Sequence, residues 1–205
     1  YLACAENSAT NKIYCFGGFD TANISQIVEY NPPSTSTDNW VVAKSAVLPT
    51  ARRYLACAEN SATNKIYCFG GSGPVSQIVE YNASADTLAA MIAVLPTARS
   101  GLACAENFAT NKIYCFGGID TNNLSQIVEY NPLTDTRTTM TAALPTARDV
   151  LACAENSATH KIYCFGGDVP VAGPTSQIVE YDLSTDNASA MIAALPTARY
   201  NLACA

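Results

Sequence analysis

The feature that most constrains this chain is a 17-residue motif that returns along its length. The motif LACAENSATNKIYCFGG spans residues 2–18 and recurs almost unchanged from Leu55, Leu102 and Leu151, while its first four letters recur from Leu202. The leucines at 2, 55, 102, 151 and 202 mark units of 53, 47, 49 and 51 residues. Periods of this length are typical of stacked units, each of which needs a neighbour to bury its apolar face. We therefore expect four structural units of one kind.

Each unit has the same order of segments. LACAE, a polar turn, KIYCFGG, a variable loop, SQIVEY, a second variable loop and a small-residue apolar stretch are followed by LPTAR. Apolar runs of this length between Asn-, Ser- and Thr-rich turns predict strands at LACAE, KIYCF and SQIVEY. The stretches that begin at Val41, Leu88, Thr138 and Ala188 contain alanine and methionine that would also suit a helix. Their short length and the proline that follows favour a fourth strand, so we expect an all-β fold.

Composition and charge exclude several classes of protein. Hydrophobic residues make up 49% of the chain and charged residues 14%, which is typical of a folded domain and not of a disordered one. The net charge is −6, and the lysines and arginines are spread over the repeats, so we expect no nucleic-acid partner. No apolar run approaches the ~20 residues that span a bilayer, so we expect no membrane span.

Nine cysteines follow the repeat. Eight form pairs eleven residues apart: Cys4 and Cys15, Cys57 and Cys68, Cys104 and Cys115, Cys153 and Cys164. This fixed spacing favours disulfides, and with them an oxidising, extracellular location, over the alternative of buried free thiols. The absence of a CxxC pattern and the single histidine, His160, speak against a zinc site. We expect His160, which replaces an asparagine of the other turns, to be an exposed turn residue.

The same pairing sets a strand register. If Cys4 lies opposite Cys15, then Ala3 faces Phe16 and Ala5 faces Tyr14, which alternates small and large side chains between neighbouring strands. Each disulfide would close a loop of about a dozen residues, which stabilises the fold by roughly 3 kcal/mol in the chain-entropy view.

The ninth cysteine, Cys204, has no partner in the pattern. Its expected partner lies eleven residues further on, beyond residue 205. We therefore expect the array to continue, either in a longer polypeptide or by docking of residues 200–205 into a neighbouring subunit.

The segments IYCFGG, VEYN and LPTAR resemble the kelch repeat. In that family a glycine pair closes the second strand and a tyrosine ends the third. The matching positions here are Gly17–Gly18, Gly70–Gly71, Gly117–Gly118 and Gly166–Gly167, with Tyr30, Tyr81, Tyr130 and Tyr181. The resemblance implies a β-propeller of four-stranded antiparallel blades, at about residues 1–53, 54–100, 101–149 and 150–199.

The chain departs from the kelch pattern in two ways. The tryptophan that often opens the fourth strand remains only as Trp40, and Leu88, Arg137 and Ala188 stand at the other three places. Kelch propellers usually have six or seven blades, so four units forming part of a larger ring is an alternative.

Two sets of residues are candidate sites. Four Asn-X-Ser sequons lie in expected loops, at Asn23, Asn82, Asn123 and Asn187, and chance occurrence in an Asn- and Ser-rich chain is the alternative to glycosylation. Arginines recur before each inner strand, at Arg52, Arg99, Arg148 and Arg199. In one interpretation they ring one mouth of the central channel of the propeller and bind an anion. In the other they bind loop carbonyls or the repeated glutamates Glu6, Glu59, Glu106 and Glu155. Because every repeat carries the arginine, the structural role is favoured.

These observations point away from catalysis. Each polar residue of interest comes in repeated copies, so no single set of nucleophile, base and orienting group stands out, and we expect no cofactor and no metal. Galactose oxidase has kelch-like blades and a copper site, but one histidine cannot supply that site. We expect a secreted structural or adhesive protein that self-associates into a larger assembly or filament. The alternative is a carbohydrate- or protein-binding propeller that uses the variable loops FDTANI, SGPV, IDTNNL and DVPVAGPT.

Overall fold

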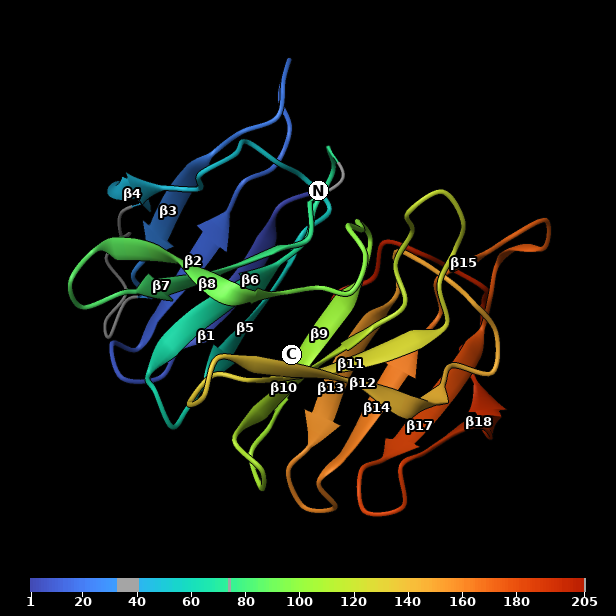
Figure 1. Cartoon of the computed structure of the whole chain (residues 1–205). Helices are drawn as coiled ribbons and strands as arrows, with labels where there is room; N and C mark the ends of the chain where they lie inside the picture. The colour runs from blue at the N-terminus through green and yellow to red at the C-terminus, as the bar shows by residue number, and fades with distance from the viewer. Residues whose placement is uncertain (33–40, 74, 205) are drawn as a thin grey trace.

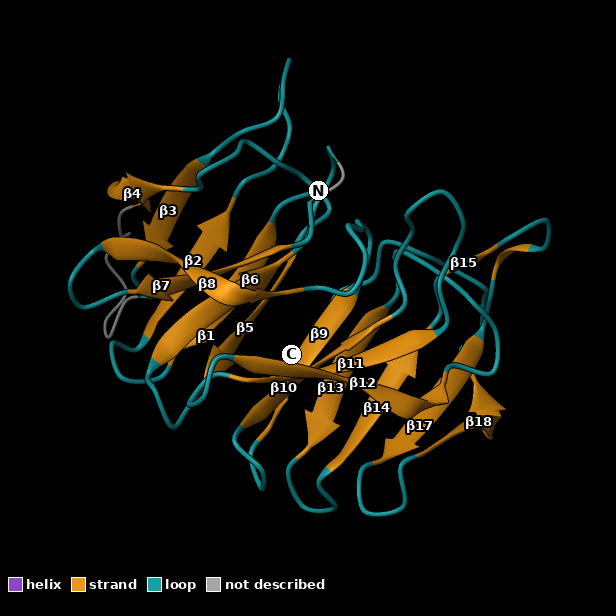
Figure 2. Ribbon diagram, in the orientation of Figure 1, coloured by secondary structure: helices purple, strands orange, loops and turns teal. Residues whose placement is uncertain are grey.

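The described part of the chain consists of β-strands joined by loops and turns. A computed structural model describes residues 1–32, 41–73 and 75–204, and Trp40 lies outside this range. Among the described residues every regular element is a strand and none is a helix (Figure 2). The all-β prediction is confirmed, and so is the fourth strand of each unit.

The strands form four antiparallel four-stranded sheets and one short hairpin. The first sheet contains β1 (Ala3–Asn7), β2 (Lys12–Phe16), β3 (Gln26–Tyr30) and β4 (Val41–Val47). The second contains β5 (Ala56–Asn60), β6 (Lys65–Phe69), β7 (Gln77–Asn82) and β8 (Thr87–Val94). The third contains β9 (Ala103–Asn107), β10 (Lys112–Phe116), β11 (Gln126–Asn131) and β12 (Thr136–Ala143). The fourth contains β13 (Ala152–Asn156), β14 (Lys161–Phe165), β17 (Gln177–Asp182) and β18 (Asn187–Ala194), and its loop carries the hairpin β15 (Asp168–Val169) and β16 (Gly173–Pro174).

Within each sheet the strands follow one another in sequence order, and the predicted register holds. Cys4 pairs with Cys15, Ala3 with Phe16 and Ala5 with Tyr14, and the other three sheets repeat this pattern. All four predicted disulfides are present, with Cα–Cα distances of 4.0–4.1 Å. Four disulfides in one chain fit an oxidising environment.

One glycine of each pair is required by a close approach of the next segment of chain. Gly70 has φ +63°, and a Cβ built on it would fall on the carbonyl oxygen of Arg99. The N–H of the second glycine, Gly71, donates to that same carbonyl at 2.9 Å. The glycine pair therefore lets the segment after LPT cross the end of the second strand, which no other residue would permit.

The four sheets follow one another in an arc (Figure 1). The first sheet lies at the upper left of the view and the fourth at the lower right, with the second and third between them. The inner strands meet along this arc, because β1 contacts β5, β5 contacts β9, and β9 contacts β13. Between described residues, the first and fourth sheets share no contact of comparable extent. The arc is therefore open between the fourth sheet and the first.

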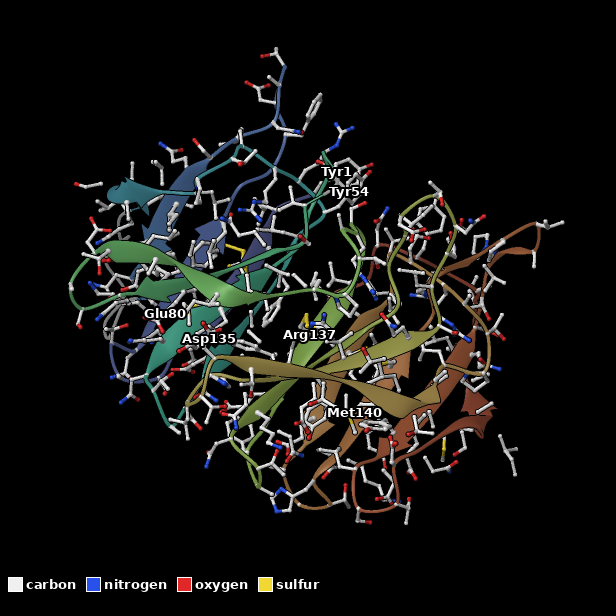
Figure 3. The ribbon with its side chains drawn as sticks, viewed as in Figure 1. Tyr1, Tyr54, Glu80, Asp135, Arg137 and Met140 are labelled. Carbon is white, nitrogen blue, oxygen red and sulfur yellow. A yellow bond between two sulfur atoms is a disulfide. The ribbon has the colours of Figure 1, made fainter. Side chains whose placement is uncertain are left out.

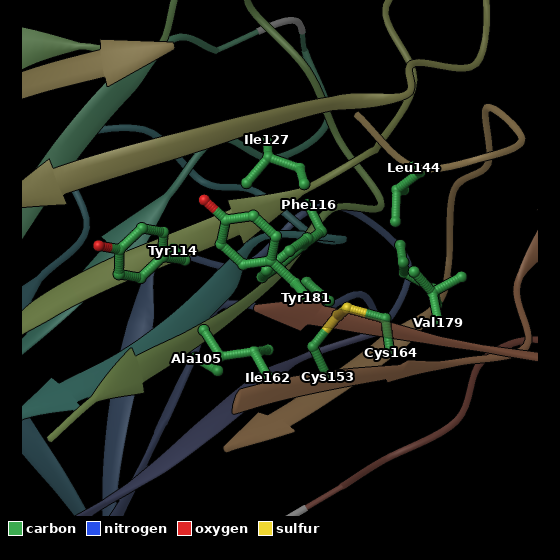
Figure 4. Close-up of a cluster of buried hydrophobic side chains, with 12 residues drawn as sticks. Ala105, Tyr114, Phe116, Ile127, Leu144, Cys153, Ile162, Cys164, Val179 and Tyr181 are labelled. Atoms are coloured by element: carbon green, nitrogen blue, oxygen red, sulfur yellow. A yellow bond between two sulfur atoms is a disulfide. The ribbon is translucent and has the colours of Figure 1, made fainter. Parts of the chain in front are cut away.

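Each sheet has two different apolar faces, which we call forward and backward. In the first sheet the forward face carries Tyr14, Phe16, Ile27 and Leu48, while the backward face carries the disulfide with Ile13, Val28 and Tyr30. The forward face of one sheet packs on the backward face of the next, and this interface occurs three times. In the last of them, Tyr181 packs against Tyr114 and Phe116, with the Cys153–Cys164 disulfide alongside (Figure 4). The core is thus three copies of one interface between sheets.

Candidate functional site: the axis and the two ends of the arc

Three of the four repeated arginines are buried, and each links its sheet to the following one by hydrogen bonds; we call this link the arginine tie. Arg52 is 0% exposed; its guanidinium donates to the Gly70 carbonyl at 2.9 Å and to Gln77 Oε1 at 2.9 Å. Arg99 and Arg148 make the same contacts one and two sheets further on. Burial lowers the pKa of all three guanidinium groups, that of Arg99 to about 10, so they stay charged at neutral pH. The structure thus places these three in loop ties and not in an open anion site.

Arg199, the fourth arginine, is exposed. Its Nε donates to the carbonyl of Thr197, two residues before it, at 3.1 Å, and its side chain makes no other hydrogen bond among the described residues. Gln26 in β3 occupies the position at which the other sheets carry the glutamine that accepts from the arginine. It is also exposed, and its side chain has no partner in the described part of the chain. Donor and acceptor of the same tie are therefore both free, at opposite ends of the arc.

The repeated glutamates bind the preceding turn, and the arginines do not contact them. Glu106 Oε1 accepts hydrogen bonds from the N–H and the hydroxyl of Ser61, each at 2.8 Å. Glu59 does the same with Ser8, and Glu155 with the N–H of Phe108. Glu6, in the first sheet, is exposed, and its side chain accepts no hydrogen bond from the described residues.

Aspartates in the outer turns make a second inter-sheet contact, which the sequence analysis did not find. Asp86 accepts hydrogen bonds from the N–H groups of Ser45 and Ala46 in β4 and from the hydroxyl of Tyr81. Asp135 and Asp186 make the matching contacts with β8 and β12. The repeated aspartate five residues after the VEY tyrosine was the available signal.

A backbone ladder joins the residues that precede each LACA motif. The N–H of Tyr54 donates to the Tyr1 carbonyl at 3.1 Å, and Gly101, Val150 and Asn201 continue the series at 2.8, 2.7 and 2.9 Å. Tyr1 and Tyr54 also lie side by side, with ring centroids 4.3 Å apart (Figure 3). The fifth copy therefore extends the ladder beyond Val150 and does not return to Tyr1.

The fifth copy begins in the geometry of the others but stops short of a strand. The Arg199 carbonyl accepts from the Gly167 N–H at 3.0 Å, and Leu202 lies against Gly166 as Leu102 lies against Gly70. Residues 202–204 are in no strand, and Cys204 is an exposed free thiol.

The outermost faces of the arc are the two unused halves of the repeated interface. Tyr30 on the backward face of the first sheet is 38% exposed, whereas Tyr81, Tyr130 and Tyr181 at the same position are 0% exposed. On the forward face of the fourth sheet, Tyr163 and Phe165 are half-buried, while their counterparts in the other sheets are buried. At these two ends, residues that are buried in the other sheets become partly exposed.

Two hollows lie beside the residues that precede or begin the LACA motifs. One, of about 350 Å³, is lined by the start of the LACA motif from all five copies, so it has no distinctive chemistry. The other, of about 640 Å³, we call the mouth cavity; its lining includes Tyr1, Tyr54, Tyr200, Asp149 and Asp168. Burial, and then the neighbouring Asp168, raise the pKa of Asp149. Phenol rings beside carboxylates suit a polar organic ligand such as a sugar.

The sequons differ in how free their side chains are. Asn187, at the start of β18, is exposed. Asn82 caps its own turn through Oδ1, and Asn23 pairs with Phe19 in an isolated bridge. The amide nitrogen of Asn123 donates to the Asp168 carbonyl at 2.8 Å and to Asp149 Oδ1 at 3.2 Å. His160 is an exposed turn residue, 3.4 Å from Glu155.

The described residues were compared with the requirements of a metal site and of a membrane-spanning helix, and the chain with known proteins. Within residues 1–32, 41–73 and 75–204, no three histidine, cysteine or acidic side chains come together to hold a metal ion. The same residues contain no helix that is long and apolar enough to cross a membrane. No protein-family model matches the chain, and no curated protein matches it.

Proposed function

We propose that this chain is a non-enzymatic extracellular structural protein that self-associates as a segment of a larger assembly. The observation that carries the proposal is the pair of end faces, because the chain repeats one interface three times and leaves its two halves unused at the ends. A structural role also explains why the buried arginines, the glutamates and the aspartates all bind neighbouring sheets.

The arrangement of the sheets supports a kelch-like propeller for this assembly. Four-stranded sheets in sequence order, inner strands that meet near one axis, and a glycine pair under each crossing segment all fit blades of that kind. We propose four blades, with the ring left open between the fourth and the first.

The size of the particle in solution tests the structural role. Light scattering and negative-stain electron microscopy of the oxidised chain should show particles larger than one chain, with mass that rises with protein concentration. A monomer at every accessible concentration would contradict the proposal.

An extracellular location also makes the sequons available for N-glycosylation. We propose glycans at Asn23, Asn82, Asn123 and Asn187, with Asn187 the most accessible and Asn123 the most engaged in hydrogen bonds. Intact mass before and after N-glycosidase treatment of protein from a secreting eukaryotic host would count the occupied sites.

The mouth cavity favours a second candidate function, binding of a carbohydrate or protein ligand. Variable-loop residues Ile119, Asp168 and Pro174 line this cavity together with tyrosines, so its chemistry differs from the invariant framework. Glycan-array binding by the monomeric chain that is lost in Asp149→Asn would support this function. Binding that is unchanged in that variant would place any ligand elsewhere.

A further inference from the structure

We propose that two copies of this chain dock head to tail, with the forward face of the fourth sheet of one copy on the backward face of the first sheet of the other. This inference rests on the proposed structural function and names the surface that performs it. The docked pair would repeat, between two chains, the interface that each chain already contains three times.

The apolar parts of the two faces match. Inside the chain, the VEY tyrosine of each sheet packs against the tyrosine and phenylalanine of the KIYCF strand before it, with ring centroids 5.4–5.8 Å apart. At the ends, Tyr30 has no such partner, and Tyr163 and Phe165 have no covering tyrosine. Docking places Tyr30 of the second copy over Tyr163 and Phe165 of the first.

The hydrogen-bonding groups of the arginine tie match between the two end faces as well. Arg52, Arg99 and Arg148 each donate to a glycine carbonyl and a glutamine of the following sheet, across 2.9–3.2 Å to the carbonyl. Among the described residues, the terminal guanidinium nitrogens of Arg199 have no acceptor, and the Gly17 carbonyl and the Gln26 side chain have no donor. A second copy brings its Gln26 and Gly17 to Arg199. An exposed arginine thereby gains the buried, hydrogen-bonded environment of the other three.

A second polar contact lies at the opposite end of the inner strands. Asn60 and Asn107 are buried in the turns that the next glutamate binds, whereas Asn156 in the fourth sheet is exposed. Glu6 of a second copy would accept from Ser157 and Asn156, as Glu106 accepts from Ser61 and Asn60. The interface is therefore specified at its centre and at both ends of the strands.

The tail after Arg199 is the one segment that must move. Leu202 occupies the place against Gly166 that Leu2 of the second copy would take. Strand β1 is held in its own sheet by five register pairs and the Cys4–Cys15 disulfide, while residues 202–204 pair with no strand. The tail therefore gives way to β1 of the second copy. A chain that ends at Arg199 should associate at least as tightly as the full chain, and loss of association in it would overturn this docking.

A mixing experiment tests the two faces directly. Tyr30→Lys disables only the backward face, and Ser157→Glu with Arg199→Glu disables only the forward face, by setting carboxylates against Glu6 and Gln26. Each variant alone should associate about tenfold or more weakly than the unchanged chain in sedimentation velocity, because aromatic and arginine contacts dominate such interfaces. Mixed together, the two should form a one-to-one dimer and nothing larger, because one good interface remains.

The outer strand offers a matched control. Ile92 in β8 is 93% exposed and far from either end face, so Ile92→Lys should assemble like the unchanged chain. Circular dichroism and the melting temperature show that each variant is folded. If the unchanged chain assembles and the end-face variants assemble equally well, this docking is wrong while the structural function stands. If the unchanged chain never assembles, both fail.

Discussion

At the scale of single residues, the repeated polar side chains join sheets to one another. Arg52 donates to the second sheet, Glu59 accepts from the first, and Asp86 binds the outer strand of the first. Arg199 and Glu6 are the end copies of the arginine and the glutamate, and among the described residues their side chains lack the partner on a neighbouring sheet that Arg52 and Glu59 have. They therefore serve as built-in comparisons.

The glutamates allow a matched pair of substitutions. Glu106→Ala should lower the free energy of unfolding by about 1–2 kcal/mol, because it leaves the part-buried donors of Ser61 and Asn60 short of an acceptor. Glu6→Ala at the equivalent, exposed position should change it by less than about 0.5 kcal/mol in the monomer. Urea denaturation of both variants measures the difference, and equal losses would contradict the assigned role of Glu106.

Asp86 predicts a dependence of stability on pH. Burial alone would raise the pKa of this carboxyl, but hydrogen bonds from Ser45, Tyr81 and Ala46 outweigh it and lower the pKa. A lowered pKa in the folded chain adds stability that is present above the unfolded pKa near 3.9 and is lost as pH falls through the folded pKa. Asp86→Asn should therefore be less stable at pH 7 by about 1–2 kcal/mol, and the difference should shrink in the range below about pH 4, as pH falls through the lowered pKa of the folded chain. A difference that stays constant over this range would contradict the prediction.

At the scale of the element, the hairpin of the first two strands is the most self-contained part of each unit. Its register, its alternation of alanine with aromatic residues and its disulfide were all predicted from the cysteine spacing, because directly paired strands obey a local rule of alternation. The outer aspartate contact was missed because it joins residues some forty positions apart, across two sheets.

Removal of one disulfide tests how much it adds to the free energy of unfolding beyond the hydrogen bonds of the hairpin. Cys104→Ser with Cys115→Ser should lower the free energy of unfolding by roughly 3 kcal/mol, because the reduced unfolded chain gains the entropy of an open loop. The Cys4–Cys15 disulfide offers a comparison, because it lies on the uncovered backward face of the first sheet. Its removal should cost the same loop entropy but disturb the packing between sheets less. Chemical denaturation of both double variants measures the two losses, and the absence of any loss would show that packing alone holds the register.

At the scale of the whole molecule, stability should be graded along the arc. The second and third sheets are covered on both faces and the first and fourth on one, as expected for an array in which each unit contacts only its neighbours.

Amide hydrogen exchange tests this gradient at a concentration where the chain is monomeric. Amides of β6, β7, β10 and β11 should exchange more slowly than the equivalent amides of β2, β3, β14 and β17, because opening an end sheet breaks one interface and opening a middle sheet breaks two. Uniform protection along the chain would mean that the four sheets unfold as a single unit.

The sequence by itself determined the repeat, the four strands of each unit, their register and the disulfides, because these depend on neighbours in sequence and on the alternation of side chains along a strand. Only the tertiary structure decided that Arg52, Arg99 and Arg148 are buried ties while Arg199 is free, because the partner of each lies on the following sheet. Only it showed the ladder through Tyr1, Tyr54, Gly101, Val150 and Asn201, since backbone hydrogen bonds leave no mark on side-chain identity. The open ends were also decided by the tertiary structure: four similar units stack face to face, and whether the last meets the first depends on the angle between sheets, which no single repeat encodes.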